Sequence, residues 1–319
     1  IEIFLMPSRS MLEAKGLGLI YGERILFKNL SMALNPKFVY GIIGESGVGK
    51  TSLLHVLSGN IDPTSGFVSL DHKVFPKISQ RLIPGLPEIG FVSAQFNLDW
   101  NHSCRENIRE AILSWPNKER ESRVDKILKL MELDKVQRTL AKDLSSGEQQ
   151  RLAIARAVAC NLRWLMLDEP FGHLDAKRKS KLCELIQKLH RSEGVGILLV
   201  SQQMEDIYRL TDYFSTLKSN GRLTKFQRPE MAYFKLTSPA EAKRFGCLNE
   251  VEWQGQHYYF RPNQYEITAN GIPLEVVRVV FNGYIFEHFC RFENQEVILY
   301  ALNHLPQTYT LVAPWLDNS

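Results

Sequence analysis

An apolar run that ends in a glycine-rich loop constrains the fold of this chain more than any other feature. The run at 38–43 predicts a buried strand, and a helical pattern over 51–58 follows the loop. The loop has the spacing G-x-x-x-x-G-K-[ST]. With the next residue it comprises Gly44, Glu45, Ser46, Gly47, Val48, Gly49, Lys50, Thr51 and Ser52. A strand, this loop and a helix in that order predict an α/β domain.

The loop has the composition of a phosphate-binding site. Glycines let successive backbone N–H groups converge on an anion, and the N-terminus of the following helix adds unsatisfied donors. We expect Lys50 to pair with the β- and γ-phosphates of a nucleoside triphosphate and the Thr51 hydroxyl to bind Mg²⁺. The alternative is a glycine-rich turn with an incidental Lys-Thr, which the flanking strand and helix disfavour.

A second apolar run ends in two carboxylates. Residues 164–167 predict a buried strand, and Asp168 and Glu169 follow it directly. Ligands of open α/β sheets bind beyond the carboxyl ends of the strands, so we expect both carboxylates near the loop. Asp168 would hold Mg²⁺, and Glu169 would act as general base toward the attacking water. The alternative is a surface Asp-Glu pair in a strand-to-helix turn.

The remaining patterns predict two domains. An apolar run at 197–200 and a helix over 176–191 complete βαβ units with a mainly parallel sheet. Short β-rich runs follow residue 225, and Asn282-Gly283 between two of them predicts a two-residue hairpin turn. We therefore expect an α/β domain over 11–228, with a helical insertion at about 98–142. A small all-β domain, either barrel or sandwich, is expected over 240–319.

Composition disfavours several classes of function. The 39 basic and 35 acidic residues are dispersed and give a net charge of only +4, so nucleic acid is not an expected partner. The five cysteines form no C-x-x-C pair and are interpreted as reduced thiols. No apolar run approaches the ~20 residues that cross a bilayer. Residues 1–10 lack a signal-peptide pattern and are interpreted as an upstream extension before Met11.

A third motif adds a family resemblance. The segment 144–151 resembles the signature of ABC (ATP-binding cassette) proteins, L-S-G-G-Q-Q-Q-R, and includes Ser145, Ser146, Gly147 and Glu148. It lies between the phosphate loop and the acidic strand, in the family's order. Residues 11–225 therefore resemble an ABC transporter ATPase of the P-loop NTPase class. The resemblance implies a Mg²⁺-dependent ATPase that is coupled to membrane transport, with ATP and Mg²⁺ as the bound groups.

The resemblance also implies partners. The signature of a second copy, or of a related ABC ATPase, would cover the γ-phosphate, and Tyr21 would stack on adenine unless it is a core or edge-strand tyrosine. The loop 172–175 would couple the two sites. An integral membrane permease would hold the chain at the cytoplasmic face of the membrane, with Phe96 and Trp100 in its docking groove. Through Arg261-Pro262 the β domain resembles, more weakly, the TOBE-like domain of import ATPases.

Three positions depart from the family pattern. Gln202 replaces a histidine that contacts the γ-phosphate, and Ser146 replaces a glycine, at an expected backbone cost of ~1 kcal/mol. Without a gap the Mg²⁺-linked glutamine falls on Ala94, and a local bulge could bring Gln95 there instead. We predict retained ATP binding and slow hydrolysis. An ATP-dependent regulatory dimerisation module and a soluble non-transport ABC ATPase are the alternatives.

Overall fold

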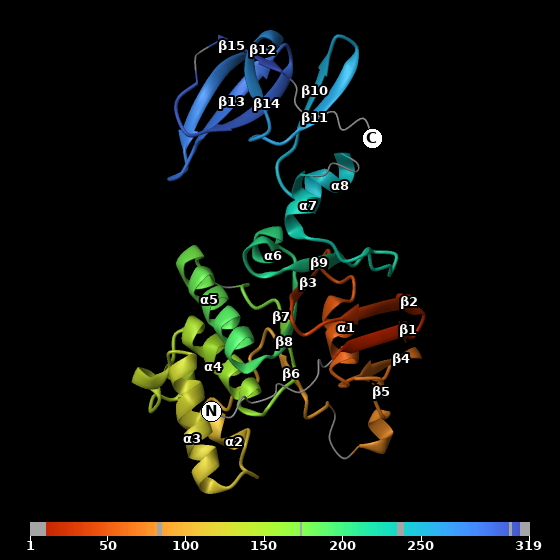
Figure 1. Cartoon of the computed structure of the whole chain (residues 1–319), viewed down its shortest axis with the longest axis vertical. Helices are drawn as coiled ribbons and strands as arrows, with labels where there is room; N and C mark the ends of the chain where they lie inside the picture. Colours follow the sequence, from red (N-terminus) through yellow and green to blue (C-terminus); the bar gives the residue numbers. More distant parts are fainter. Residues whose placement is uncertain (1–10, 82–84, 173, 235–238, 306–307, 313–319) are drawn as a thin grey trace, which may run out of the picture. The chain divides into compact units, whose positions relative to one another are not determined.

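A computed structural model describes residues 11–81, 85–172, 174–234, 239–305 and 308–312 (Figure 1). The chain divides into two compact units, Ile1–Pro229 and Glu230–Ser319. The first is an α/β unit with a helical subdomain, and the second contains antiparallel sheets, so the predicted fold class is confirmed. In the described part of the chain, none of the helices combines the length and the apolar character needed to span a membrane.

A five-stranded parallel sheet forms the centre of the first unit. Its order is β6-β7-β8-β3-β9, and each pairing between neighbours is parallel. The strands are β3 (Val39–Ile43), β6 (Ile89–Val92), β7 (Trp164–Asp168), β8 (Gly196–Ser201) and β9 (Tyr213–Thr216). Every residue of β3, β7 and β8 is buried, as the near-continuous apolar runs predicted. Because the strands are parallel, their carboxyl ends share one edge of the sheet.

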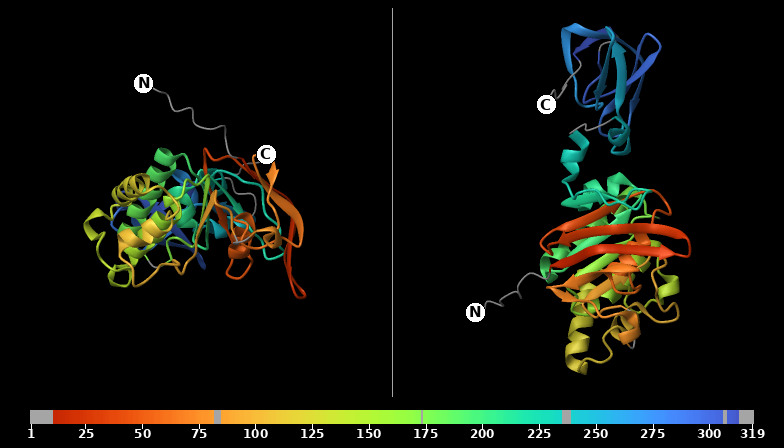
Figure 2. Two further views of the ribbon diagram at one scale, coloured as in Figure 1. Left: turned by 90° about the horizontal axis from the view of Figure 1, so that it is seen from below. Right: turned by 90° about the vertical axis from the view of Figure 1, so that its right-hand side faces the viewer.

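An antiparallel sheet of order β2-β1-β4-β5 lies beside this centre (Figure 2). Its strands are β1 (Leu12–Tyr21), β2 (Arg24–Leu34), β4 (Ser65–Leu70) and β5 (Lys73–Val74). The helix α1 (Lys50–Leu57) carries Leu53 and Leu54 into one core cluster with Phe27 of β2 and Ile42 of β3. Apolar contacts on both sides of α1 thus fix its N-terminus beneath the glycine-rich loop.

Apart from a short 3-10 turn after β5, the remaining helices of this unit lie on the other flank of the parallel sheet or in the insertion (Figure 1). Within 98–142 they are α2 (Cys104–Glu110), α3 (Asn117–Leu130) and the short 3-10 turns η2 (Asp134–Val136) and η3 (Ala141–Asp143). The predicted helical insertion is therefore confirmed. The others are η1 (Ile78–Gln80), α4 (Ser146–Ala159), α5 (Ala176–Glu193) and α6 (Met204–Leu210).

The second unit contains two antiparallel sheets around one core, which includes Val251, Phe260 and Leu274. The sheets are β10-β11 and β14-β13-β12-β15. The elements are α7 (Pro229–Phe234), α8 (Pro239–Arg244), β10 (Asn249–Trp253), β11 (Gln256–Phe260), β12 (Glu266–Phe281), β13 (Phe286–Phe292), β14 (Gln295–Ala301) and β15 (Thr308–Val312). The strand β12 is long, and its pairing with β15 changes register between Ile267 and Ile272.

The predicted two-residue hairpin turn at Asn282-Gly283 is wrong. Phe281 of β12 pairs directly with Phe286 of β13, so four residues, 282–285, form the connection. The Asn282 side chain accepts hydrogen bonds from the backbone N–H groups of Tyr284 and Ile285, and Gly283 has a φ of 96°. These hydrogen bonds satisfy two backbone N–H groups of the four-residue turn. The dipeptide Asn-Gly alone does not predict them.

Candidate functional site

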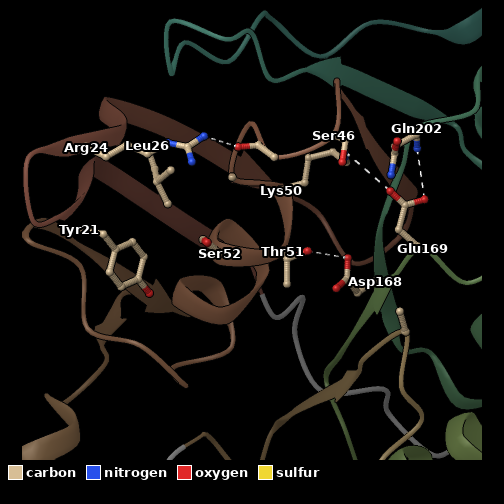
Figure 3. Close-up of a pocket in the computed structure, with 13 residues that line it drawn as sticks. Tyr21, Arg24, Leu26, Ser46, Lys50, Thr51, Ser52, Asp168, Glu169 and Gln202 are labelled. Carbon is tan, nitrogen blue, oxygen red and sulfur yellow. Dashed lines mark hydrogen bonds and ion pairs between the residues drawn. The ribbon is translucent and has the colours of Figure 1, made fainter.

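The predicted phosphate loop and the two predicted carboxylates meet at the carboxyl ends of β3, β7 and β8 (Figure 3). A cavity of about 430 Å³ opens there. Its wall comes from the β1–β2 hairpin, the loop with the start of α1, and the segments that follow β6, β7 and β8. The lining residues are Tyr21, Arg24, Leu26, Ser46, Gly47, Gly49, Lys50, Thr51, Ser52, Ala94, Asp168, Glu169 and Gln202.

Backbone geometry of the loop requires its glycines. Gly47 and Gly49 have φ values of 75° and 104°, in the region that disfavours any side chain. A Cβ on Gly44 would lie 2.7 Å from the carbonyl oxygen of Leu217. Val48, between these positions, packs against the core of the unit. The loop can therefore keep a tight turn in which its N–H groups remain available to an anion.

Lys50 is the central cation of the site. Its side chain is only 6% exposed, and Nζ donates to the carbonyl oxygens of Gly44 and Glu45 at 2.8 and 3.0 Å. Nζ also lies 3.7 Å from Oε1 of Glu169. Burial lowers the pKa of the Lys50 ammonium, and the opposing attraction of Glu169 and Asp168 limits this effect. The Lys50 ammonium thus lies between the loop carbonyls and the carboxylates. A phosphate group of a ligand could replace either of these two contacts.

Thr51 and Asp168 form a pair of oxygen groups beside Lys50. The Thr51 hydroxyl donates to Oδ1 of Asp168 at 3.1 Å, although 117 residues separate them in the sequence. Burial raises the pKa of the Asp168 carboxyl, while the hydrogen bond from Thr51 acts in the opposite direction. A buried carboxylate next to a hydroxyl offers the hard oxygen ligands that suit Mg²⁺, so these residues fit the predicted metal.

Glu169 is oriented by the segment that follows β8. Its Oε2 accepts a hydrogen bond from the backbone N–H of Gln202 at 3.3 Å, and its own φ is 48°. That segment is held in turn by a polar network below it. The Ser201 hydroxyl donates to Asp206 at 2.8 Å and accepts from the N–H of Gln203 at 3.0 Å. The carboxylate is thus positioned by the backbone of Gln202, whose side chain lines the cavity.

Tyr21 and Arg24 form the opposite end of the cavity. They pair across the tight connection between β1 and β2, so their side chains share one face. Tyr21 is 50% exposed, which leaves a ring face open to a ligand. Arg24 donates from Nη2 to the Gly47 carbonyl at 2.8 Å (Figure 3). Our sequence reasoning missed Arg24. The two-residue spacer after Tyr21 was the available signal, because a hairpin there places both residues side by side.

The signature residues form the N-terminus of α4 and do not line this cavity. Ser145 is the N-cap, its N–H and hydroxyl donate to Oε2 of Glu148 at 2.9 and 2.7 Å, and Gly147 lies between them. Ser145 and Ser146 are exposed. Ser146 begins the helix and is absent from the residues with positive φ, so the expected cost of its backbone angle is not found. An exposed helix tip is accessible to a second molecule.

The structure does not bring Gln95 to the cavity. Ala94 lines the wall, whereas Gln95 is exposed and not part of it. The chain turns immediately after β6, with a hydrogen bond from the Phe96 N–H to the Ser93 carbonyl at 3.0 Å. Phe96 and Asn97 have positive φ values of 68° and 48°. In this turn Ala94 faces the cavity. It therefore takes the position of the family's Mg²⁺-linked glutamine, as the comparison without a gap indicated.

The described residues of the predicted coupling loop and of the predicted docking groove do not line the cavity. His173 lies outside the described residues, and Asp175 is the N-cap of α5, accepting from the Arg178 N–H at 2.9 Å. Phe96 is half-buried, and Trp100, at the start of the insertion, is 42% exposed. An aromatic side chain this exposed is available for contact with another molecule.

Fold and site together define a P-loop nucleotide-binding protein, and comparison with known proteins refines this class. A family model described as ABC transporter matches residues 27–172. Methionine import ATP-binding protein MetN of Halalkalibacterium halodurans is 31% identical over 238 residues, which cover 70% of each chain. The chain belongs to the ABC transporter family and groups there with ATP-binding proteins of import type.

Further relatives support this placement. Glucose import ATP-binding protein GlcV of Saccharolobus solfataricus is 30% identical over 236 residues, 72% of this chain and 66% of that protein. A MetN of Geobacillus kaustophilus is 32% identical over 68% of this chain and 64% of its own length. The chain therefore spans slightly less than two thirds of these two relatives.

Solved structures agree with the fold. The dimeric structure of MJ0796, a bacterial ABC transporter cassette, matches with a TM-score of 0.60 and 28% identity. The match covers 68% of this chain and 98% of that one. A second structure of MJ0796, dimeric in a post-hydrolysis state and bound to ADP and Pi, has a TM-score of 0.59.

Proposed function

We propose that this chain is the ATP-binding and ATP-hydrolysing subunit of an ABC importer. The observation that supports this proposal best is the convergence of Lys50, the Thr51–Asp168 pair and Glu169 on one cavity. Import is supported by the relatives, whose names include methionine, glucose and sulfate/thiosulfate import. The transported solute is not assigned, because these relatives differ in it.

The proposed catalytic roles follow from the contacts. ATP would lie with adenine on the ring of Tyr21 and its phosphates on the N–H groups of the loop and on Lys50. Thr51 and Asp168 would hold Mg²⁺, which neutralises phosphate charge when it is bound. Glu169, already oriented by the Gln202 N–H, would accept the proton of the attacking water as general base.

We further propose that hydrolysis is slow. Where the family has histidine, Gln202 supplies a neutral amide that can donate a hydrogen bond but has no titratable proton. Ala94, at the inward position after β6, offers no side-chain oxygen to a metal. Both changes remove contacts that would strengthen in the transition state, so they would lower turnover more than ATP affinity.

The proposed assembly is a homodimer, or a dimer with a related ABC ATPase, that encloses ATP. The exposed tip of α4 at Ser145 and Ser146 supports it, because a helix N-terminus attracts anions. A membrane permease would be the second partner and would hold the chain at the cytoplasmic face. The exposed Trp100 in the insertion supports a contact of this kind. The second unit would be a TOBE-like accessory domain with contact or regulatory roles.

Purified full chain tests this proposal in two steps. Calorimetric titration with Mg-ATP measures binding, and phosphate release measures turnover for the unaltered chain and for Glu169→Gln. Binding by both proteins, with slow release that Glu169→Gln abolishes, would support the ATPase. Equal release from the two would instead favour the alternative of a regulatory module that dimerises on ATP, which the residues Gln202 and Ala94 allow. Absence of any Mg-ATP binding would refute both.

A further inference from the structure

Arg24 is a cation in the wall of the cavity, and its contacts differ from those of Lys50. It lines the cavity at the end of the β1–β2 hairpin, and its recorded hydrogen bond is to the Gly47 carbonyl at 2.8 Å. Within the described residues, no carboxylate forms an ion pair with it. Lys50, the other cation of the wall, has Glu169 within 3.7 Å. The positive charge of Arg24 therefore has no carboxylate partner in the part of the chain that the structure describes.

The position and the planar shape of the Arg24 guanidinium restrict the ligand groups that it can contact. In Figure 3 the Arg24 side chain extends from the hairpin that carries Tyr21 toward the loop residues Ser46 and Lys50, and all four residues line the cavity. A ligand that stacks on Tyr21 and extends to Lys50 must pass beside the guanidinium. Only one of its five N–H groups is used by Gly47, and the planar fork can hold an anion with the others. The ligand group that fits this charge is a phosphate.

We propose that Arg24 is a second phosphate-positioning residue, which pairs by charge with the phosphate chain of the nucleotide while it holds the loop at Gly47. This inference rests on the proposed function, since it assigns a new contact within the same site. The cavity wall carries two cations, Arg24 and Lys50, against the carboxylates Asp168 and Glu169. The side-chain charges of the wall therefore sum to about zero. Removal of Arg24 would leave the wall with a net negative charge, which disfavours the binding of a polyphosphate.

Substitutions separate charge pairing from support of the loop. Arg24→Gln keeps an N–H donor on a shorter side chain but removes the charge, whereas Arg24→Lys keeps the charge without the planar fork. Lys28→Ala is the matched control, because Lys28 is an exposed cation on the same strand, β2, and does not line the cavity. Calorimetry measures the dissociation constants of Mg-ATP and Mg-ADP for each full-length protein. Circular dichroism and thermal melting confirm that each variant is folded.

Charge pairing predicts a specific order. Arg24→Ala and Arg24→Gln should both weaken Mg-ATP and Mg-ADP binding by roughly 5- to 10-fold, the effect of one partly exposed charge-assisted hydrogen bond. Arg24→Lys should lose less than either, and Lys28→Ala should bind as the unaltered chain does. The affinity of the unaltered chain should also fall more steeply with salt than that of Arg24→Gln.

Two results would overturn the inference while the proposed function stands. One is Mg-ATP binding within twofold of the unaltered chain for both Arg24→Ala and Arg24→Gln. The other is normal binding by Arg24→Gln alone, because loop support without charge would then explain the residue. Failure of the unaltered chain to bind Mg-ATP is a distinct result that refutes the proposed function and this inference with it.

Discussion

Gln202→His tests whether the missing histidine limits turnover. The backbone N–H of Gln202, not its side chain, holds Glu169 at 3.3 Å, so the substitution leaves the orientation of the general base unchanged. The side chain itself lines the cavity near Glu169 and Lys50. The substitution therefore changes one side-chain donor at the end of the cavity where the γ-phosphate would lie.

The expected magnitude follows from the two donors. A neutral amide forms a hydrogen bond to a phosphate oxygen, whereas a protonated imidazole forms a charge-assisted one that is about twice as strong. The difference is on the order of 1.4 kcal/mol, which corresponds to about a tenfold increase in kcat. We expect no comparable change in ATP affinity, because the gain arises mainly as charge develops in the transition state.

Phosphate release by the purified chain, with Mg-ATP in excess, measures the effect. Gln202→His should raise kcat about tenfold, and Glu169→Gln in the same background should abolish the gain. The variant should also acquire a pH dependence centred near the imidazole pKa of about 6.5, which the unaltered chain lacks at this position. A kcat within twofold of the unaltered chain, or a gain in affinity of equal size, would refute the reasoning.

Four further predictions concern the Thr51–Asp168 pair and the packing of the two units. Thr51→Ala should weaken ATP binding in Mg²⁺ and have little effect in EDTA, by titration in both buffers. Burial raises the pKa of Asp168, so folding binds a proton and stability declines as pH rises through that pKa; Asp168→Asn should therefore raise Tm at pH 7 without nucleotide. Gly196→Ala, whose Cβ would lie 2.8 Å from the Trp164 ring, should cost about 1–3 kcal/mol in urea unfolding. Arg261→Leu should lower the stability of the second unit by about 3 kcal/mol, measured the same way, because it leaves one buried and three partly buried backbone carbonyls without the Arg261 donor.

Local sequence patterns determined the elements of the first unit. The buried runs became β3, β7 and β8, and the glycine loop leads directly into α1. The caps also agree with local rules, since Ser145 is the N-cap of α4 and Gly194, with a φ of 66°, is the C-cap of α5. Such features depend on residues within a few positions of one another, so the sequence alone can reveal them.

Where short-range patterns allow more than one geometry, the sequence was ambiguous. Asn282-Gly283 suits a two-residue turn, but hydrogen bonds that the Asn282 side chain accepts from backbone N–H groups stabilise a four-residue connection. In the same way, an ungapped chain and a local bulge were equally acceptable after β6, and the turn at Phe96 placed Ala94 inward. Energy differences between such alternatives depend on contacts with neighbouring elements that periodicity does not encode.

The sequence by itself thus determined the fold class, the phosphate loop and the carboxylates that accompany it. Only the tertiary structure decided which side chains meet: Thr51 with Asp168, Arg24 with Gly47, and Arg261 with the carbonyls around α8. Strand order, register and the packing of α1 between two sheets bring these residues together. Strand order, register and helix packing arise from contacts between residues far apart in the chain. A sequence pattern reflects only the conformational preferences of residues that are close together in it.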